Sequence, residues 1–279
     1  METNLRQSKA SVKVEGILSS KDLEVIKDKN GNNCIRGKIG IKVDDTNTIS
    51  FKVFVGEKTS KGEINKAWAG INTVMNDYKS IADVGADAAD RVHVNGQFNT
   101  YRNQNGEDIC TYQSNFFTRV TRPLDPKREF EAEMFINNKY PEVDSEGEFT
   151  GRIKVKGIAP NYNGIDIIEF VIPEDLADQA DSMIEIGTTA QFWGDIVNAK
   201  IEKKIPVALG KPKTETTYIN ELVLTGMSEV YPEERAYDAE AIKLALQEYE
   251  ATQSQNAKKT EEKKPERPSA AGSGRTMTF

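Results

Sequence analysis

The sequence reads ISFKVFV at residues 49–55, INKAWAGINTVM at residues 64–75 and RVHVNGQF at residues 91–98. In the first stretch Phe51 and Val53 share one face of an alternating pattern, which is the two-residue period of a β-strand with one buried side. The second stretch spaces its apolar residues by three and four, as an amphipathic helix does. The third stretch alternates again. The order strand, helix, strand is therefore predicted for this part of the chain.

Two further strands are predicted before this unit and one after it. The first covers residues 12–18 and continues or restarts at 23–26, the second covers 34–43, and the last covers 109–120. The dipeptides Asn30-Gly31 and Asn105-Gly106 supply the turn chemistry that joins neighbouring antiparallel strands. Three strands, a helix and a long hairpin form the element order of an OB-fold, a small Greek-key β-barrel.

The same order recurs after a linker at residues 122–126, which contains two prolines. Val94-Asn95-Gly96 and Phe192-Trp193-Gly194 occupy equivalent places, and residues 115–120 are matched with residues 220–225. The hairpin tip of the second copy is expected to be a longer loop, from Ile201 to Thr217. The remaining predicted elements of this copy are strands at 131–136, 151–158, 165–172, 187–200 and 218–230, and a helix at 173–183.

These patterns predict an all-β protein of two tandem OB-fold barrels, each with a helix between its third and fourth strands. The predicted domains are residues 1–122 and residues 123–232. Residues 233–253 have the Ala, Leu, Glu and Gln composition of a helix. Residues 254–279 are too polar to bury a core, so a disordered tail is expected there.

Charge is unevenly distributed between the predicted domains. The whole chain has a net charge of −7, but residues 1–122 carry 18 Lys and Arg against 15 Asp and Glu, a net charge of +3. Residues 123–232 carry 11 against 20, a net charge of −9. A polyanion is therefore expected to bind the first domain in preference to the second.

The sequence contains no recognisable catalytic constellation. Cys34, Cys110 and His93 are too scattered for a structural zinc site, which needs four nitrogen or sulfur ligands at close spacing. Phosphate-binding loops and nucleophile elbows are absent from the sequence. There is also no apolar run long enough to span a bilayer and no signal peptide. We therefore expect a cytoplasmic protein that is not an enzyme and has no cofactor or metal.

Several stretches resemble the bacterial type of single-stranded-DNA-binding protein. Residues 92–98 followed by Thr100, a basic residue, a glycine turn and Thr111-Tyr112 resemble that family's long hairpin. Residues 12–18 resemble its first strand and residues 49–56 its third. The resemblance implies a protein that coats single strands without sequence preference in replication, recombination or repair. Two such barrels in one chain are more typical of phage or plasmid proteins, in which case the location is the host cytoplasm.

The chain departs from that family in three respects. Ile49 stands where the family has a stacking Trp, and Gly274 to Thr278 replace its acidic tail tip. The second barrel is strongly acidic. The terminal Phe279 is nevertheless the expected docking residue for replication or recombination proteins, because the family docks a terminal Phe in a partner's pocket. A homodimer is left open.

Proteins with OB-folds hold single strands with basic grooves and exposed aromatic rings. For each aromatic candidate the alternative is packing in the core. Tyr101-Arg102 is the strongest pair, because an aromatic ring beside a guanidinium suits stacking and phosphate contact together. A protein–protein adaptor or an RNA-binding protein remain alternative functions. The candidate DNA-binding residues are Lys13, Arg36, Lys38, Lys42, Lys52, Phe54, Tyr101, Arg102, Tyr112 and Phe116.

Overall fold

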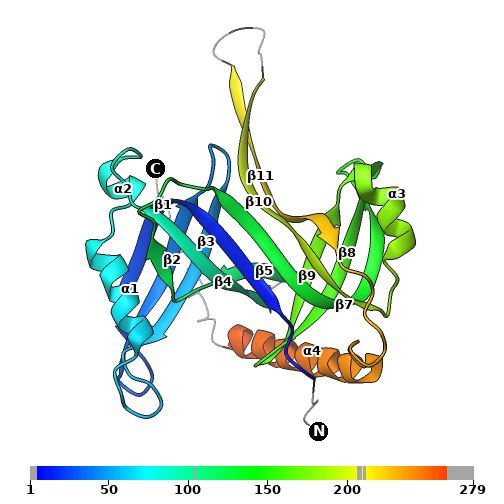
Figure 1. The fold of residues 1–279 in the computed structure, drawn as a ribbon, viewed down its shortest axis with the longest axis horizontal. Helices are drawn as coiled ribbons and strands as arrows, with labels where there is room; N and C mark the ends of the chain where they lie inside the picture. Colours follow the sequence, from blue (N-terminus) through cyan, green and yellow to red (C-terminus); the bar gives the residue numbers. More distant parts are fainter. Residues whose placement is uncertain (1–4, 104, 206–208, 210–211, 263–279) are drawn as a thin grey trace, which may run out of the picture.

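The computed structural model describes residues 5–103, 105–205, 209 and 212–262. Most of these residues are in β-strands, which form one mixed 11-stranded sheet. Figure 1 shows the sheet curled into two halves that stand side by side, the N-terminal one in blue and cyan and the C-terminal one in green and yellow. A long helix crosses beneath both halves.

The strands of the N-terminal half pair in a closed circuit. The strands pair in the order β1, β2, β3, β5 and β4, and β4 returns to pair with β1. All of these pairs are antiparallel except β3 and β5, which are parallel. The predicted order of three strands, a helix and a hairpin is confirmed. The elements are β1 (Ala10–Lys27), β2 (Asn33–Lys42), β3 (Thr48–Gly56), α1 (Lys66–Asp77), α2 (Ile81–Val84), β4 (Arg91–Arg102), β5 (Asp108–Gln113) and β6 (Phe117–Arg119).

The single fifth strand predicted at residues 109–120 is wrong, because Ser114 interrupts it. The Ser114 hydroxyl accepts a hydrogen bond from the Phe116 amide and donates one to the Asn95 carbonyl. The chain therefore turns between β5 and β6, and β6 pairs with β4 instead of extending β5.

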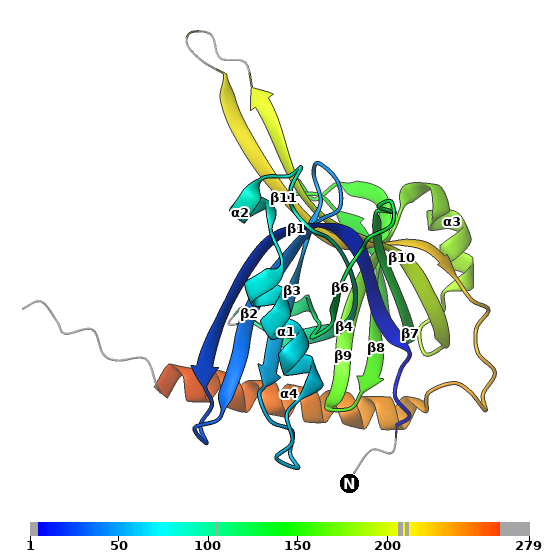
Figure 2. The same cartoon turned by 60° about the vertical axis from the view of Figure 1, so that its left-hand side comes forward.

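The C-terminal half repeats this circuit. Its strands pair in the order β7, β8, β9, β11 and β10, and β10 returns to β7. The β10–β11 ladder continues from Ile201↔Thr217 to Ile205↔Lys213, where sequence analysis expected a loop; Figure 2 shows this ribbon projecting from the body. The elements are β7 (Lys127–Val143), β8 (Phe149–Asn161), β9 (Gly164–Ile172), α3 (Glu174–Met183), β10 (Thr189–Ile205) and β11 (Lys213–Met227).

Strands β1 and β7 pair in an antiparallel ladder that joins the two halves. The halves are related by an approximate two-fold axis that passes through this ladder. Val12 pairs with Gly96 within the first half, and Phe130 pairs with Gly194 within the second. Val12 and Phe130 pair with each other across the seam. Because equivalent residues face one another, the ladder supports an internal duplication in which the two copies meet as a symmetric dimer would.

Only one of the two proposed sequence equivalences agrees with these ladders. Gly96 and Gly194 occupy matching positions, as predicted. The match of residues 115–120 with residues 220–225 is wrong, because the parallel bridges pair Phe51 with Tyr112 in one half and Val171 with Val223 in the other. Strand β5, which ends at Gln113, is therefore the counterpart of β11.

Gly96 and Gly194, which occupy equivalent positions in the two halves, allow groups of other strands to approach the backbone closely. A Cβ atom on Gly194 would lie 2.0 Å from the Val223 carbonyl oxygen, and one on Gly96 would lie 2.5 Å from the Phe51 ring. A side chain at either position would push apart the strands that close the circuit.

One hydrophobic core runs through both halves. The cluster includes Val12 and Val14 of β1 together with Phe51 of the first half and Phe130 of the second. The predicted inward face of β3, which bears Phe51, Val53 and Val55, is confirmed because all three side chains are buried.

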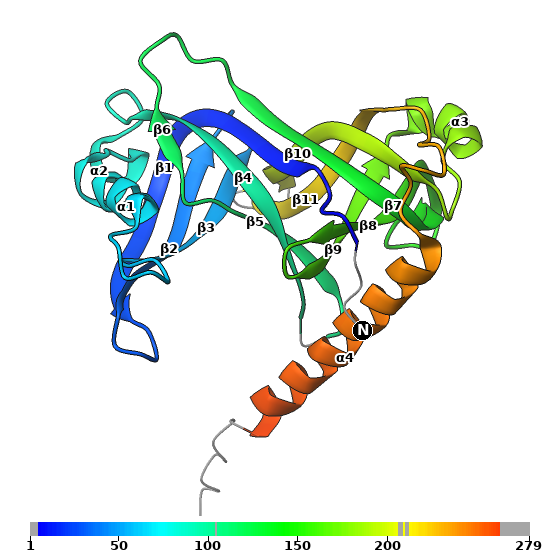
Figure 3. The same ribbon diagram turned by 60° about the horizontal axis from the view of Figure 1, so that its bottom comes forward.

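Helix α4 (Ala239–Glu262) runs nine residues past the predicted end at Gln253, so the expected start of the tail at residue 254 is wrong. Its first turns cover a second cluster formed by Phe135, Ile158, Ile165 and Ile167 with Tyr237, Ile242 and Ala245. The Tyr249 hydroxyl lies 3.4 Å from an Asp108 carboxylate oxygen in the first half. The helix therefore contacts both halves (Figure 3). Phe279 and the rest of residues 263–279 lie outside the described residues.

The linker is held to β1 by a buried carboxylate. Glu15 is 1% exposed and accepts hydrogen bonds from the Arg122 guanidinium at 2.7 Å and the Asp125 amide at 3.0 Å. Burial raises the pKa of Glu15, but the hydrogen bonds from Arg122 and Asp125 outweigh it and leave the pKa below its usual value. Glu15 therefore fixes the path of the chain between the halves.

We predict that Arg122→Ala lowers the free energy of unfolding at neutral pH by about 1–3 kcal/mol, because it leaves a buried carboxylate with fewer donors. The loss should shrink below about pH 4, since stability from a lowered carboxyl pKa is present above the unfolded pKa and disappears as Glu15 protonates. Urea unfolding across this pH range measures both effects. Lys127→Ala, which removes an exposed ion pair with Asp125, is the control and should change stability by less than about 1 kcal/mol. A loss for Arg122→Ala that does not change with pH would contradict this account.

Candidate nucleic-acid interface

The outward side of β2 and β3 carries three cations and one aromatic ring. The strand register pairs Arg36 with Phe54 and Lys38 with Lys52. All four alternate with buried residues, so their side chains project from the same side of the sheet. Phe54 is 62% exposed, which leaves its ring open to a ligand.

Tyr101 on β4 joins this surface through Lys52. The Lys52 Nζ atom lies 4.3 Å from the centroid of the Tyr101 ring, a cation–π distance. Desolvation by burial and the charge of Lys38 lower the pKa of Lys52. An anion placed between the two lysines would relieve the second effect.

Phe116 is placed by the segment between β5 and β6. The Asn115 amide group donates to the Phe54 carbonyl at 3.1 Å and accepts from the Phe54 amide at 3.3 Å. The Asn115 side chain thus takes the place of a backbone partner for β3. The next residue, Phe116, is 68% exposed. Sequence analysis identified Phe116 but missed Asn115, because no local pattern indicates a side chain that replaces a strand partner.

We call this surface the basic aromatic face. Arg36 forms an exposed ion pair with Glu24 at 2.7 Å, which contributes little to stability and can exchange for a phosphate. In the described part of the chain, Lys38 and Lys52 form no ion pair with a carboxylate. The face consists of Arg36, Lys38, Lys52, Phe54, Tyr101 and Phe116.

Two of the predicted residues are engaged inside the protein. Tyr112 is 5% exposed and packs against Phe51 and Phe98, so its ring cannot stack on a base. Arg102 forms an ion pair with Asp108 at 2.9 Å and lies over the Tyr249 ring, because Thr100 and Arg102 point toward the second half and α4. The expectation of DNA contact is corrected for both residues.

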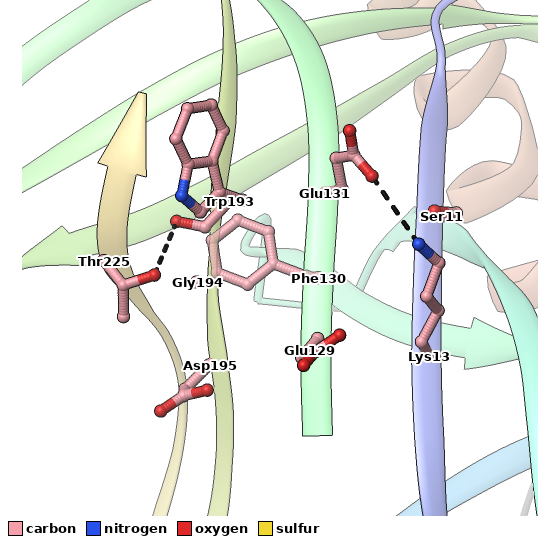
Figure 4. A pocket seen from close by; sticks show the side chains of 9 residues that line it. All are labelled: Ser11, Lys13, Glu129, Phe130, Glu131, Trp193, Gly194, Asp195 and Thr225. Atoms are coloured by element: carbon pink, nitrogen blue, oxygen red, sulfur yellow. Dashed lines mark hydrogen bonds and ion pairs between the residues drawn. The ribbon is translucent and has the colours of Figure 1, made fainter. Parts of the chain in front are cut away.

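Lys13 lies away from the basic aromatic face, whereas Lys42 projects from the same side of β2 as Arg36 and Lys38 but stands at the end of the strand. Lys42 pairs with Asp45 at 3.2 Å in the turn after β2. Lys13 lines a cavity of about 410 Å³ at the seam between the halves, where Glu131 lies 3.9 Å from its Nζ atom and Glu129 and Asp195 add negative charge (Figure 4). A phosphate would be repelled there, so Lys13 is also removed from the interface.

The second half carries a neutralised copy of the same cations. Strand β8 holds the place of β2 and carries Arg152 and Lys154 with the same spacing as Arg36 and Lys38. Glu142 lies 3.2 Å from Arg152 and 3.4 Å from Lys154, and Glu221 lies 2.7 Å from Arg152. The acidic residues that make this half negative therefore include the partners of its own cations.

The first half also covers part of this copy. Asp108 from the β4–β5 hairpin lies 3.7 Å from Lys156, and Thr100 donates to Asp166 at 2.9 Å. A cavity of about 220 Å³ between the halves is lined by residues of β5 together with Lys154, Glu169 and Glu221. The cations of the second half are thus neutralised and partly covered, whereas those of the basic aromatic face are not covered by the described residues of the other half.

Across the residues that the structure describes, no group of three or more His, Cys, Asp or Glu side chains is arranged to hold a metal ion. No helix in those ranges is long and apolar enough to cross a membrane.

The family model described as YorF matches residues 9–264. The chain therefore belongs to the YorF family. Among solved structures it is similar to the wild-type single-stranded DNA binding protein from Thermus aquaticus, with a TM-score of 0.50 and 8% sequence identity over 81% of this chain and 95% of that one. A deletion mutant of the same protein matches with a TM-score of 0.49 and 10% identity, over 82% and 99% of the two chains. No curated protein sequence matches the chain. At these identities the likeness is one of fold.

We predict that Lys38→Met raises the pKa of Lys52 toward its ordinary value, because it removes the nearby positive charge that helps to lower it. The recovery should be incomplete, since burial of Lys52 remains. Titration of the Lys52 side chain by carbon-detected NMR measures the shift. Lys58→Met, which removes an exposed lysine just after β3, is the control and should leave the titration unchanged.

Proposed function

We propose that this protein binds single-stranded DNA without sequence preference and acts in replication, recombination or repair as a coating protein rather than an enzyme. We further propose that residues 1–122 and 123–232 are two OB-type barrels, of which the first binds the strand. The observation that carries the proposal is the basic aromatic face. There Lys38 and Lys52, which form no ion pair with a carboxylate among the described residues, lie among the exposed rings of Phe54, Tyr101 and Phe116.

This combination favours single strands over duplexes. An exposed ring offers a flat surface to an unpaired base, and each such stack stabilises binding by about 1–3 kcal/mol. In a duplex the base faces are already stacked on one another, so the rings gain nothing. The lysines contact phosphates of any sequence, which explains the absence of sequence preference.

The contrast between the halves supports the assignment to the first barrel. Lys154 in the second half has the same strand position as Lys38, but Glu142 neutralises it. The similarity to the Thermus aquaticus protein, whose name states that it binds single-stranded DNA, is consistent with the proposal.

The proposal is tested by comparing Lys38→Ala with its counterpart Lys154→Ala. Wild-type protein should bind oligo(dT) far more tightly than matched duplex, and its affinity should fall steeply with salt because bound phosphates release counterions. Lys38→Ala should reduce the slope of log affinity against log salt by about 0.7, the value for one phosphate contact on a single strand. Lys154→Ala should leave the slope unchanged. Fluorescence anisotropy at several salt concentrations gives these values.

Binding to duplex as tight as to oligo(dT), or binding to neither, would refute the proposal and favour a protein–protein adaptor. Tighter binding to an RNA of the same length would instead identify an RNA-binding protein.

We also predict that Phe54→Ala and Phe116→Ala each weaken oligo(dT) binding by about five- to 150-fold, since each removes one stacking platform. The salt slope should not change, because neither ring contacts a phosphate. Phe149→Ala is the matched control, because Phe149 is 74% exposed but lies on the second half at the start of β8. Equal losses for all three variants would show that the rings act only through general surface effects.

A further inference from the structure

Beside the basic aromatic face, the structure has a polar groove between the two halves that contains no lysine or arginine in its lining. Two adjoining hollows of about 320 Å³ and 140 Å³ share Gln113, Asn161 and Asn163 in their walls. Figure 3 shows the place, where the ends of β4 and β5 approach the β8–β9 turn above α4. We call it the amide groove and define it by Gln97, Asn99, Gln113, Asn161, Tyr162 and Asn163.

The groove is continuous with the basic aromatic face. Gln113 is the register partner of Lys52 in the β3–β5 bridge. Asn99 donates to the Gln113 side-chain oxygen at 3.2 Å and lies two residues before Tyr101 on β4. A strand whose phosphates contact Lys52 would therefore reach the groove with its next nucleotides.

The chemistry of the walls suits bases rather than phosphates. No Lys or Arg is among the residues that line the two hollows. The lining acids are Glu248, which is exposed on α4, and Asp166, which is buried and accepts hydrogen bonds from Thr100 and Asn161. Carboxylates repel a phosphate, whereas a side-chain amide offers both a donor and an acceptor to the edge of a neutral base.

One side of the groove is a rigid turn that presents an aromatic ring. Asn161 accepts from the Asn163 amide at 2.8 Å and donates to Asp166 at 2.7 Å, which fixes the turn between β8 and β9. Tyr162 lies at its tip and is 88% exposed. A fully exposed tyrosine on a fixed turn is an aromatic platform of the kind on which unpaired bases stack.

We propose that the amide groove is a second subsite for the same nucleic-acid strand, which takes unpaired bases between the amide side chains and the Tyr162 ring. This inference rests on the proposed function. It assigns to the acidic second half a contribution through bases, while phosphate contacts remain with the first half.

The test uses the full chain, the variant Tyr162→Ala and an oligo(dT) of about 16 nucleotides, the upper end of the range for one OB-fold. Tyr162→Ala should weaken binding by about five- to 150-fold. Its salt slope should equal that of wild type, because no phosphate contact is lost. On a strand of the same length with abasic sites, Tyr162→Ala and wild type should bind alike. Phe149→Ala controls for loss of an exposed ring on the second half.

A double variant, Asn99→Ala with Gln113→Ala, tests the opposite wall and should show the same pattern as Tyr162→Ala. Wild-type affinity for oligo(dT) in both variants would overturn the subsite while leaving the proposed function intact. A reduced salt slope in Tyr162→Ala would also overturn it, since the ring would then act on phosphates. Failure of the wild-type protein to bind oligo(dT) would overturn both proposals together.

Discussion

The structure depends on the pairing of β1 along both of its edges. Between Val12 and Glu15 its backbone bonds to β4 on one edge and to β7 on the other. The first ladder closes the N-terminal half and the second attaches the C-terminal half, so one stretch of chain serves both. This explains why Glu15 is buried within a strand and why its charge must be met by Arg122 and the Asp125 amide. It also explains the continuous core, since Val12 and Val14 belong to one hydrophobic cluster with buried residues of both halves.

The approximate two-fold relation leaves the halves alike in backbone and unlike in surface. Lys38 and Lys154 have matching positions, but Lys154 has a carboxylate at 3.4 Å, whereas Lys38 forms no ion pair within the described part of the chain. Symmetry is also broken by the hairpins, because β4–β5 lies against the second half through Asp108 and Lys156 whereas β10–β11 projects as a ribbon. Helix α4 then contacts the second half through Ile242 and the first half through Tyr249. A duplicated fold thus presents one open basic face, and the second copy is neutralised and partly covered.

The candidate interface has two parts, and each part suits a different chemical group of a nucleic acid. Cations and rings on β2, β3 and β4 suit phosphates and base faces, and the neighbouring amides suit base edges. Lys13, Arg102 and Tyr112 do not belong to it, although their residue types are those of a binding surface. A charged or aromatic residue becomes a ligand contact only where its own protein leaves it unpaired and exposed.

The sequence by itself determined the β-strand periods, the position of α1 between β3 and β4 and the inward face of Phe51, Val53 and Val55. These features follow from local alternation and turn chemistry, which act over a few residues. It also determined that Lys52 and Phe54 lie on the face opposite Phe51, because strand geometry fixes alternate faces. The register of β2 with β3, which places Arg36 and Lys38 beside them, came from the tertiary structure. Only the tertiary structure decided which of those side chains stay free. The ion pair of Lys13 with Glu131 forms where β1 meets β7, and Arg102 lies over the Tyr249 ring where α4 crosses the first half. The carboxylate partners of Arg102 and Lys154 come from the adjacent strand of a hairpin, and Tyr112 is buried against Phe51 and Phe98 of neighbouring strands. These contacts depend on strand register and on the packing of the two halves, which no local pattern in the sequence encodes.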